Sequence, residues 1–264
     1  MAERSIAAAV RELCLAFPEA ETVESHGSPG FRARKGKFFA YFCVNHHGDG
    51  HVALWLNTPA LEQSRLLRSS KHLFKPPYLG PAGWIGVELN RGVSWKLVAQ
   101  LAHSAYVNSS PRKLVARLGK PPATPRPTVR MKPQQIDRLL APRALKARAQ
   151  LQRICAALPE AAETVSSGFV TWRIGKKGFA SLYDFGQGLT ASFWVGIERQ
   201  VPLDLDPRFH IPKYLGHAGW MALDLSRPIA DSEWGELVEG SYRHFASRRC
   251  LTALDAGPAA RRRR

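Results

Sequence analysis

A stretch near the start of this chain of 264 residues returns, in altered form, in its second half. Residues 13–20, Leu-Cys-Leu-Ala-Phe-Pro-Glu-Ala, match residues 154–161, Ile-Cys-Ala-Ala-Leu-Pro-Glu-Ala. Residues 78–84, Tyr-Leu-Gly-Pro-Ala-Gly-Trp, match residues 214–220, Tyr-Leu-Gly-His-Ala-Gly-Trp. The order is kept and the offset drifts only from 141 to 136, which is what small loop insertions and deletions produce. The sequence therefore predicts two copies of one folded unit.

We place the first copy at residues 1–118 and the second at residues 144–255. The connector, residues 119–143, begins with a proline-rich stretch that predicts a stiff, extended chain. Its later part has apolar residues at helical spacing, which predicts a short basic helix interrupted near Pro142. The tail, residues 256–264, ends in four arginines and is expected to be disordered.

Each copy contains helical and extended patterns in the same order. In the first copy, Thr58-Pro59-Ala60 reads as the start of a helix and Ser94 as the cap of a later one. These patterns predict an α+β fold of two layers in each copy, an antiparallel sheet with helices on one face. The expected elements are a helix at 5–17 and strands at 30–34, 37–44, 52–56 and 84–89, then in the second copy a helix at 146–157, strands at 169–174, 178–184, 189–197 and 220–225, and a helix at 231–246.

Positive charge is concentrated in the first half of the chain. The whole chain has 38 Lys and Arg against 21 Asp and Glu, for a net charge of +17. Residues 1–118 hold 15 bases and 8 acids, and residues 119–150 hold 8 bases and 1 acid, whereas residues 151–264 are nearly balanced with 15 and 12. Such a field favours polyanions, because Lys and Arg release the counterions that condense on phosphate backbones. Solubility alone is the other explanation for the charge.

Basic side chains in the first copy and the connector are therefore the candidate contacts to nucleic acid, DNA or RNA. Four of them lie on a predicted hairpin, which could run along a phosphate backbone or only protect an exposed sheet edge. The connector cations could clamp a strand or serve only in a spacer. The candidates are Arg32, Arg34, Lys35, Lys37, Lys71, Lys75, Arg112, Lys113, Arg126, Arg130 and Lys132.

The repeated Tyr-Leu-Gly-x-Ala-Gly-Trp segment requires an explanation common to both copies. One interpretation is a surface on which Tyr78, Trp84, Tyr214 and Trp220 stack nucleobases or bind a small ligand or a protein partner. The other is a structural loop that places the tryptophans on the helix layer, since large aromatic residues at strand starts usually pack. If these loops bind a small ligand or a protein instead of nucleobases, the alternative function follows, a binding module with no nucleic-acid role.

Catalytic and metal chemistry have little support in the sequence. His46, His47 and His51 lie in one predicted hairpin turn, and a single loop seldom closes a metal site. Cys14 and Cys155 occupy equivalent positions among apolar neighbours, which predicts core packing rather than nucleophilic catalysis. We expect no enzyme activity, no cofactor and no metal.

The expected location of the protein and its lack of a membrane partner are inferred from sequence features that are not found. No stretch has the roughly 18 apolar residues of a membrane span, and no secretory signal is visible. The four cysteines are too few and too scattered for a disulfide scaffold. We therefore expect a cytoplasmic protein without a membrane partner, and the sequence identifies no protein partner.

Several of these segments resemble the MmcQ/YjbR family. They are residues 25–32, Ser-His-Gly-Ser-Pro-Gly-Phe-Arg, residues 36–40, Gly-Lys-Phe-Phe-Ala, and residues 74–80, Phe-Lys-Pro-Pro-Tyr-Leu-Gly. The resemblance extends over nearly all of each copy and implies two tandem domains of the CyaY-like, double-wing α+β fold, with DNA binding as the function. The second copy departs from the pattern, because Ser167 stands at the position of His26 and no proline matches Pro29.

Overall fold

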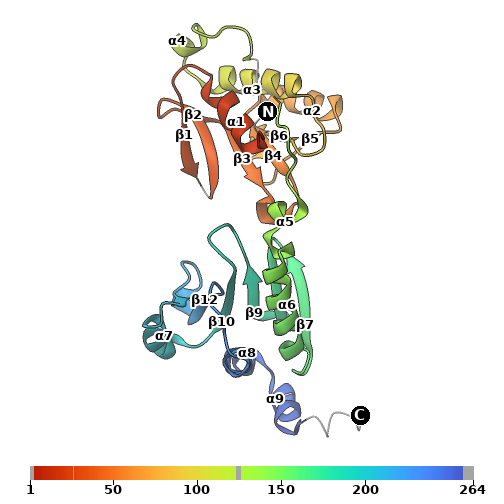
Figure 1. Ribbon diagram of the computed structural model, residues 1–264, viewed down its shortest axis with the longest axis vertical. Helices are drawn as coiled ribbons and strands as arrows, with labels where there is room; N and C mark the ends of the chain where they lie inside the picture. The colour runs from red at the N-terminus through yellow and green to blue at the C-terminus, as the bar shows by residue number, and fades with distance from the viewer. Residues whose placement is uncertain (1–2, 26, 123–125, 258–264) are drawn as a thin grey trace. The chain divides into compact units, whose positions relative to one another are not determined.

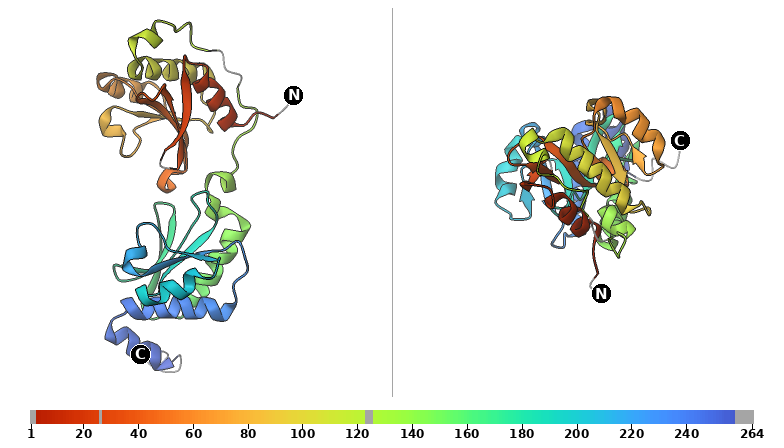
Figure 2. Two further views of the ribbon diagram at one scale, coloured as in Figure 1. Left: turned by 90° about the vertical axis from the view of Figure 1, so that its left-hand side faces the viewer. Right: turned by 90° about the horizontal axis from the view of Figure 1, so that it is seen from above.

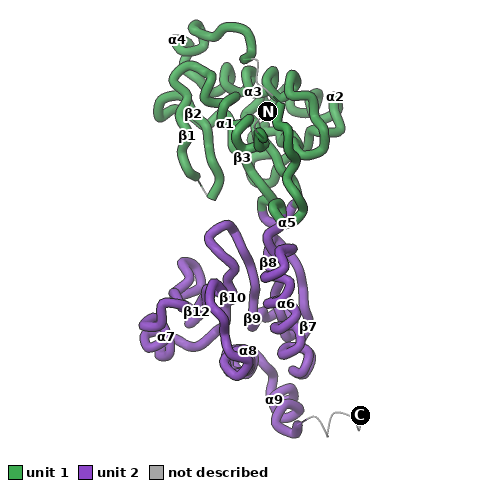
Figure 3. Tube along the Cα trace, in the orientation of Figure 1, with its two compact units in different colours: residues 1–46, 50–136 green, residues 47–49, 137–264 purple. Residues whose placement is uncertain are grey.

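The computed structural model describes residues 3–25, 27–122 and 126–257. The chain divides into two compact units, drawn in different colours in Figure 3. Unit 1 comprises residues 1–46 and 50–136, and unit 2 comprises residues 137–264 together with 47–49. Most of the predicted tail, from residue 258 on, lies outside the described residues.

Unit 1 is a six-stranded antiparallel sheet with helices on one face (Figure 1). Its strand order is β1-β2-β3-β4-β6-β5, so β6 lies between β4 and β5. The strands are β1 (Ala20–Ser25), β2 (Ser28–Ala33), β3 (Phe38–Val44), β4 (Val52–Leu56), β5 (Leu73–Phe74) and β6 (Ile85–Glu88). The helices are α1 (Ile6–Leu15), α2 (Ala60–Ser69), α3 (Trp95–Ser109), α4 (Arg112–Val115) and α5 (Pro133–Ile136).

Unit 2 repeats this sheet, with the order β11-β12-β10-β9-β8-β7. Helix α8 lies across the sheet and contacts β9 and β10 (Figure 2). The strands are β7 (Ala161–Ser166), β8 (Phe169–Ile174), β9 (Lys177–Tyr183), β10 (Thr190–Trp194), β11 (Phe209–His210) and β12 (Trp220–Asp224), and the helices are α6 (Pro142–Cys155), α7 (Ile197–Asp204), α8 (Asp231–Phe245) and α9 (Arg248–Asp255). The predicted tandem of two-layer α+β domains is therefore confirmed.

The sequence-based prediction missed the edge strands β1 and β7. Neither strand alternates between buried and exposed residues; most positions are half-buried or exposed. Each strand is held instead by backbone pairing, β1 with β2 and β7 with β8. Hydrophobic periodicity, the main sequence signal for strands, is weak where a strand packs little against the core.

Two predicted helix caps differ from the structure. Helix α2 begins at Ala60 without a side-chain cap, because the Thr58 hydroxyl donates instead to the carbonyl of Gly83, at 2.6 Å. Ser94 occupies the cap position of α3 but its side chain makes no capping bond. The Thr58 side chain is therefore used in a tertiary hydrogen bond and the Ser94 side chain is exposed, although the local pattern predicted that each would cap a helix.

A main core lies between the helices and the sheet in each unit. In unit 1, Leu54 and Leu56 of β4 belong to that core. Residues alternating with them, Ala53 and Trp55, belong to a second cluster with Trp84. Since successive side chains of a strand point to opposite faces, this second cluster lies on the face of the sheet turned away from α1 and α3.

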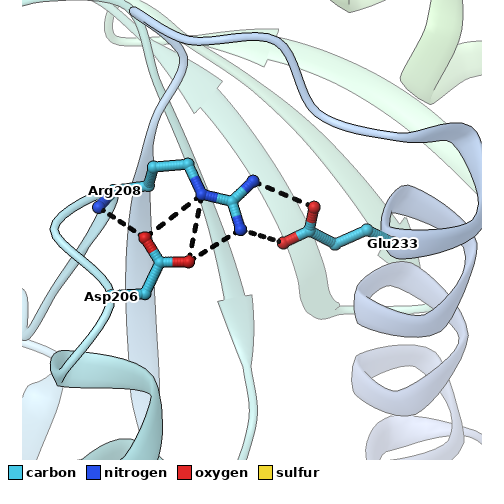
Figure 4. Close-up of polar contacts among 3 residues, drawn as sticks. All are labelled: Asp206, Arg208 and Glu233. Atoms are coloured by element: carbon cyan, nitrogen blue, oxygen red, sulfur yellow. Dashed lines mark hydrogen bonds and ion pairs between the residues drawn. The ribbon is translucent and has the colours of Figure 1, made fainter.

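Unit 2 carries a three-residue ion network next to β11 (Figure 4). The Arg208 guanidinium donates to both oxygens of Glu233, at 2.8 and 3.0 Å, and to Asp206 at 2.7 Å. The side-chain and backbone hydrogen bonds of Arg208 lower the pKa of Asp206 below its ordinary value. The network therefore ties the α7–β11 turn to the first turn of α8.

Substituting Arg208→Met is expected to change how the stability of unit 2 depends on pH. A carboxyl whose pKa is lower in the folded state stabilises the fold above its unfolded pKa, about 3.9, and this stability is lost as pH falls through the folded value. The variant should therefore be less stable than the wild type at pH 7, and the difference should shrink toward pH 3. Urea denaturation across that range measures it. Arg199→Met removes an exposed arginine that forms no ion pair with the described residues, and it should leave the pH dependence unchanged.

Candidate nucleic-acid interface

The repeated Tyr-Leu-Gly-x-Ala-Gly-Trp loop has the same geometry in both units. Each loop makes a 3-10 turn, over Gly80–Ala82 and Gly216–Ala218, and each then uses a left-handed glycine, with φ of 95° at Gly83 and 84° at Gly219. These positive angles explain why both copies retain glycine there.

A glutamine holds each loop in place. The Gln63 side-chain amide donates to the carbonyls of Gly80 and Trp84, at 2.7 Å each. In unit 2, Gln200 makes the equivalent pair of bonds, at 2.7 and 2.9 Å. The sequence analysis missed both residues. The signal was present, because both glutamines lie in the helix before the loop, 21 and 20 residues ahead of the tryptophan.

The interpretation that the loop tryptophans pack on the helix layer is wrong for Trp84 and agrees with the contact that Trp220 makes. Trp84 is 8% exposed and belongs to the cluster on the opposite face of the sheet, 5.5 Å from Tyr41 between ring centroids. Trp220 does contact α8, through Phe245 at 5.9 Å. The loop tyrosines Tyr78 and Tyr214 are 72% and 79% exposed. The tryptophans of the two loops therefore pack against other aromatic side chains, whereas the tyrosines of the loops are exposed.

The candidate cations of unit 1 divide between the two ends of its sheet. The β2–β3 turn lies beside the end of β4 and the start of β6, as the strand register shows. Arg34, Lys35 and Lys37 are in or next to this turn. Lys75 follows β5 at the same end, whereas Lys71 precedes β5 at the other end.

Two carboxylates bind cations near this turn. Glu21 accepts from the Arg32 guanidinium at 2.8 Å and from the backbone N–H of Lys35 at 2.9 Å. Both bonds lower the pKa of Glu21, the backbone bond most, so this carboxylate remains charged and balances Arg32. Glu19 forms ion pairs with both Arg34 and Arg117.

Helix α4 brings further cations to the same end of unit 1. Its residues Arg112 and Lys113 are exposed, and Arg117 follows one turn later. Because Glu19 binds both Arg34 and Arg117, the β2–β3 turn and the α4 segment lie together. The sequence analysis did not single out Arg117. We call this group the basic end of unit 1: Arg34, Lys35, Lys37, Arg112, Lys113 and Arg117.

The connector cations lie at the opposite end of unit 1. The Asn90 side chain, beyond the far end of β6, donates to the carbonyl of Met131 at 3.0 Å and accepts from its N–H at 2.8 Å. Figure 1 accordingly shows α4 and α5 at opposite ends of the unit. Arg130 and Lys132 flank Met131, and Arg126 precedes them; all three are exposed. The predicted cations therefore do not form one continuous face.

Unit 2 has a smaller group of cations at the equivalent end. Lys176 and Lys177 lie at its β8–β9 turn, and Arg248 begins α9. Arg249 forms an ion pair with Glu160, which corresponds to Glu19 in the repeat. Both glutamates adopt a left-handed backbone, with φ of 52° and 57°. The arrangement is thus a property of the repeated fold.

The face of the unit 1 sheet that is turned away from α1 and α3 carries a row of aromatic rings. The Arg32 guanidinium lies 5.6 Å from the centre of the Phe38 ring, and Phe38 lies 4.8 Å from Tyr41. The row continues from Tyr41 to Trp84, Trp55 belongs to the same cluster as Trp84, and Phe74 packs against that cluster. We call Phe38, Tyr41, Trp55, Phe74 and Trp84 the aromatic face.

The histidine turn contributes packing to this face. His51 donates to or accepts from Glu88 at 2.7 Å and stacks on Phe74 with 4.1 Å between ring centroids. Within the described ranges, no three histidine, cysteine or carboxylate side chains come together as metal ligands. Cys14 and Cys155 are buried in the two cores as predicted, and burial raises the pKa of both thiols.

Fold and repeat together define this protein as a tandem of two antiparallel α+β domains. The YjbR family model matches residues 15–108 and 156–244, so the chain belongs to the YjbR family, once in each copy. A solved structure, that of Deinococcus radiodurans protein DR2400 with domain DUF419, is similar over 40% of this chain and 85% of its own, at 20% identity and a TM-score of 0.34. No curated protein matches the chain. Among the described residues, no helix is both long and apolar enough to cross a membrane.

Proposed function

We propose that this protein binds nucleic acid through contacts between the phosphate backbone and the basic end of unit 1. The observation that carries the proposal is the basic end itself, six cations from the β2–β3 turn and the α4 segment that Glu19 joins through its ion pairs with Arg34 and Arg117. Lys35, Lys37, Arg112 and Lys113 are exposed and pair with no carboxylate among the described residues. Such side chains exchange condensed counterions for phosphate contacts.

Binding to the phosphate backbone requires no base-specific contact from the basic end and no catalytic step. Lysine and arginine side chains on phosphates position a protein on nucleic acid without reading sequence. The connector cations Arg126, Arg130 and Lys132 form a second, separate set at the other end of the unit. We expect them to add less affinity, since they cannot contact the same phosphates as α4.

Two charge variants of the full chain test this proposal against a DNA duplex. Replacing Lys35, Lys37, Arg112 and Lys113 together by alanine should weaken binding at low salt by about tenfold or more. It should also flatten the slope of log affinity against log salt, by about 0.9 for each phosphate that the variant no longer neutralises. Replacing Arg126, Arg130 and Lys132 by alanine is the matched control and should change both quantities less.

Two outcomes would refute the proposal. Wild-type protein without micromolar affinity at low salt, or with affinity independent of salt, does not bind through phosphates. That result would favour the alternative, a protein- or ligand-binding module on the repeated loops. An equal or larger loss of affinity in the connector variant would show that the interface lies at the other end of unit 1.

A further inference from the structure

The aromatic face of unit 1 contains a buried hydrogen-bond donor without an acceptor. Trp55 is 3% exposed, and its indole N–H has no hydrogen-bond partner among the described residues. Buried indole N–H groups usually find an acceptor, so this donor calls for an explanation. Trp234 also lacks one, but it lies on α8 within the core of unit 2, 5.9 Å from Phe193.

Two rings from separate segments follow on from Trp55, the first in contact with it and the second in contact with the first. His46, in the β3–β4 turn, meets Trp55 edge-on with 4.7 Å between ring centroids. Tyr78, in the β5–β6 loop, meets His46 edge-on at 6.1 Å. Tyr78 is largely exposed and has a φ of 61°, in the left-handed region that non-glycine residues rarely adopt. Backbone strain of this kind is concentrated at binding sites and switches.

Unit 2 shows that the fold does not require this arrangement. The strand register places Ser192 of β10 at the position of Trp55. The Ser192 hydroxyl is satisfied by the Tyr183 hydroxyl, at 3.1 Å. Tyr214 corresponds to Tyr78, is equally exposed, and does not have a positive φ. The aromatic group with an unsatisfied donor is therefore particular to unit 1.

We propose that Tyr78, His46 and Trp55 form a slot for a single unpaired nucleobase. The base stacks on the Tyr78 ring, and one of its carbonyl oxygens or ring nitrogens accepts the Trp55 N–H once the side chains that bury this group move aside. Every base offers a flat ring and an acceptor, so the slot tolerates any sequence. Stacking on an aromatic side chain strengthens single-strand binding by about tenfold or more per base.

The inference rests on the proposed function and specifies it as single-strand binding. The aromatic face connects the basic end to the slot. Lys37 of the basic end directly precedes Phe38, and the rings continue from Phe38 through Tyr41 to Trp84. A single strand held by its phosphates at the basic end can thus lay its bases along the face.

The test compares a short thymidine oligonucleotide with an abasic oligonucleotide of the same length and charge, using the full chain. The variant Tyr78→Ala should weaken thymidine binding about tenfold and leave abasic binding unchanged. Tyr214→Ala, the equivalent change in unit 2, should alter neither affinity. Trp55→Phe keeps a large ring and removes the donor, and it should also weaken only thymidine binding. Because Tyr78 is exposed, its truncation leaves the core intact, and circular dichroism checks this.

The outcomes separate this inference from the proposed function. If wild-type protein binds both oligonucleotides equally and Tyr78→Ala has no effect, the slot is refuted while phosphate binding stands. If Tyr78→Ala and Tyr214→Ala weaken thymidine binding equally, the slot is again refuted, because the loops then act alike. If the wild type binds neither oligonucleotide at low salt but binds the duplex, the slot is refuted and the proposed function stands; if it binds no duplex either, the proposed function itself fails.

Discussion

Truncating Tyr106 to alanine is expected to destabilise unit 1 by about 3–5 kcal/mol. Tyr106 is fully buried on α3, stacked on Phe17 at 4.9 Å and edge-on to Phe39 at 5.3 Å. Its hydroxyl donates to the carbonyl of Pro18 at 2.6 Å. The substitution leaves a cavity in the centre of the core and an acceptor without its donor.

The variant Tyr106→Phe separates the ring from the hydroxyl. It keeps the packing and should cost only about 1 kcal/mol for the missing hydrogen bond. Pro18 precedes Glu19, which binds Arg34 and Arg117, so this variant should also loosen the basic end and weaken duplex binding.

Chemical denaturation measures the free energy of unfolding of both Tyr106 variants. Tyr214→Ala is the control at an exposed position, and its stability is expected to lie within about 0.5 kcal/mol of wild type. A destabilisation below about 1 kcal/mol for Tyr106→Ala would contradict the packing described for this core.

Substituting Gly83→Val is expected to cost several kcal/mol, about 1–3 for the backbone conformation and a similar amount for crowding. Gly83 has a φ of 95°, and a Cβ there would lie 3.0 Å from the Thr58 carbonyl oxygen and 3.2 Å from the Cα of Ala60. Both neighbours are backbone atoms, which cannot move aside as a flexible side chain would. The loop and the start of α2 would therefore shift together.

The control Gly50→Val isolates the conformational part of this cost. Gly50 has a similar left-handed backbone, with a φ of 70°, and a Cβ there would meet nothing within 4 Å. Its decrease in stability, measured by chemical denaturation, should be clearly smaller than that of Gly83→Val. Equal decreases in stability for the two variants would show that the close approach to Thr58 and Ala60 adds nothing to the cost of Gly83→Val.

The repeat was the most informative feature of the sequence. It predicted the two units, their order of elements and their α+β layers, because a duplicated segment folds twice by the same physics. Strands with a buried face, such as β4 and β10, were predicted close to their observed positions. The edge strands β1 and β7 were missed, since their pairing depends on neighbours rather than on their own periodicity.

The candidate interface could be predicted only in part. Counting charges found most of the cations of the basic end, but not Arg117, whose ion pair with Glu19 joins residues 98 positions apart. The sequence also offered the connector cations as contacts, but it did not show that Asn90 holds the connector at the end of the unit opposite the basic hairpin. Charge is a property of composition, but its position depends on which distant segments the fold brings together.

The aromatic face illustrates the same division. Alternation along β3 and β4 is visible in the sequence, and it places Tyr41 and Trp55 on one side. Only the register of β4 with β6, and the path of the two loops, bring His46 against Trp55 and Tyr78 against His46. No local sequence pattern predicts that these three side chains come together.

By itself, the sequence determined the duplication, the layered α+β fold, the burial of Cys14 and Cys155, and the excess of positive charge. These follow from periodicity and composition, which act over a few residues at a time. Tertiary structure alone decided which cations share an end of unit 1 and which face Trp84 covers. It also decided that the N–H of Trp55 is buried without an acceptor among the described residues, because each of these depends on contacts between residues far apart in the chain.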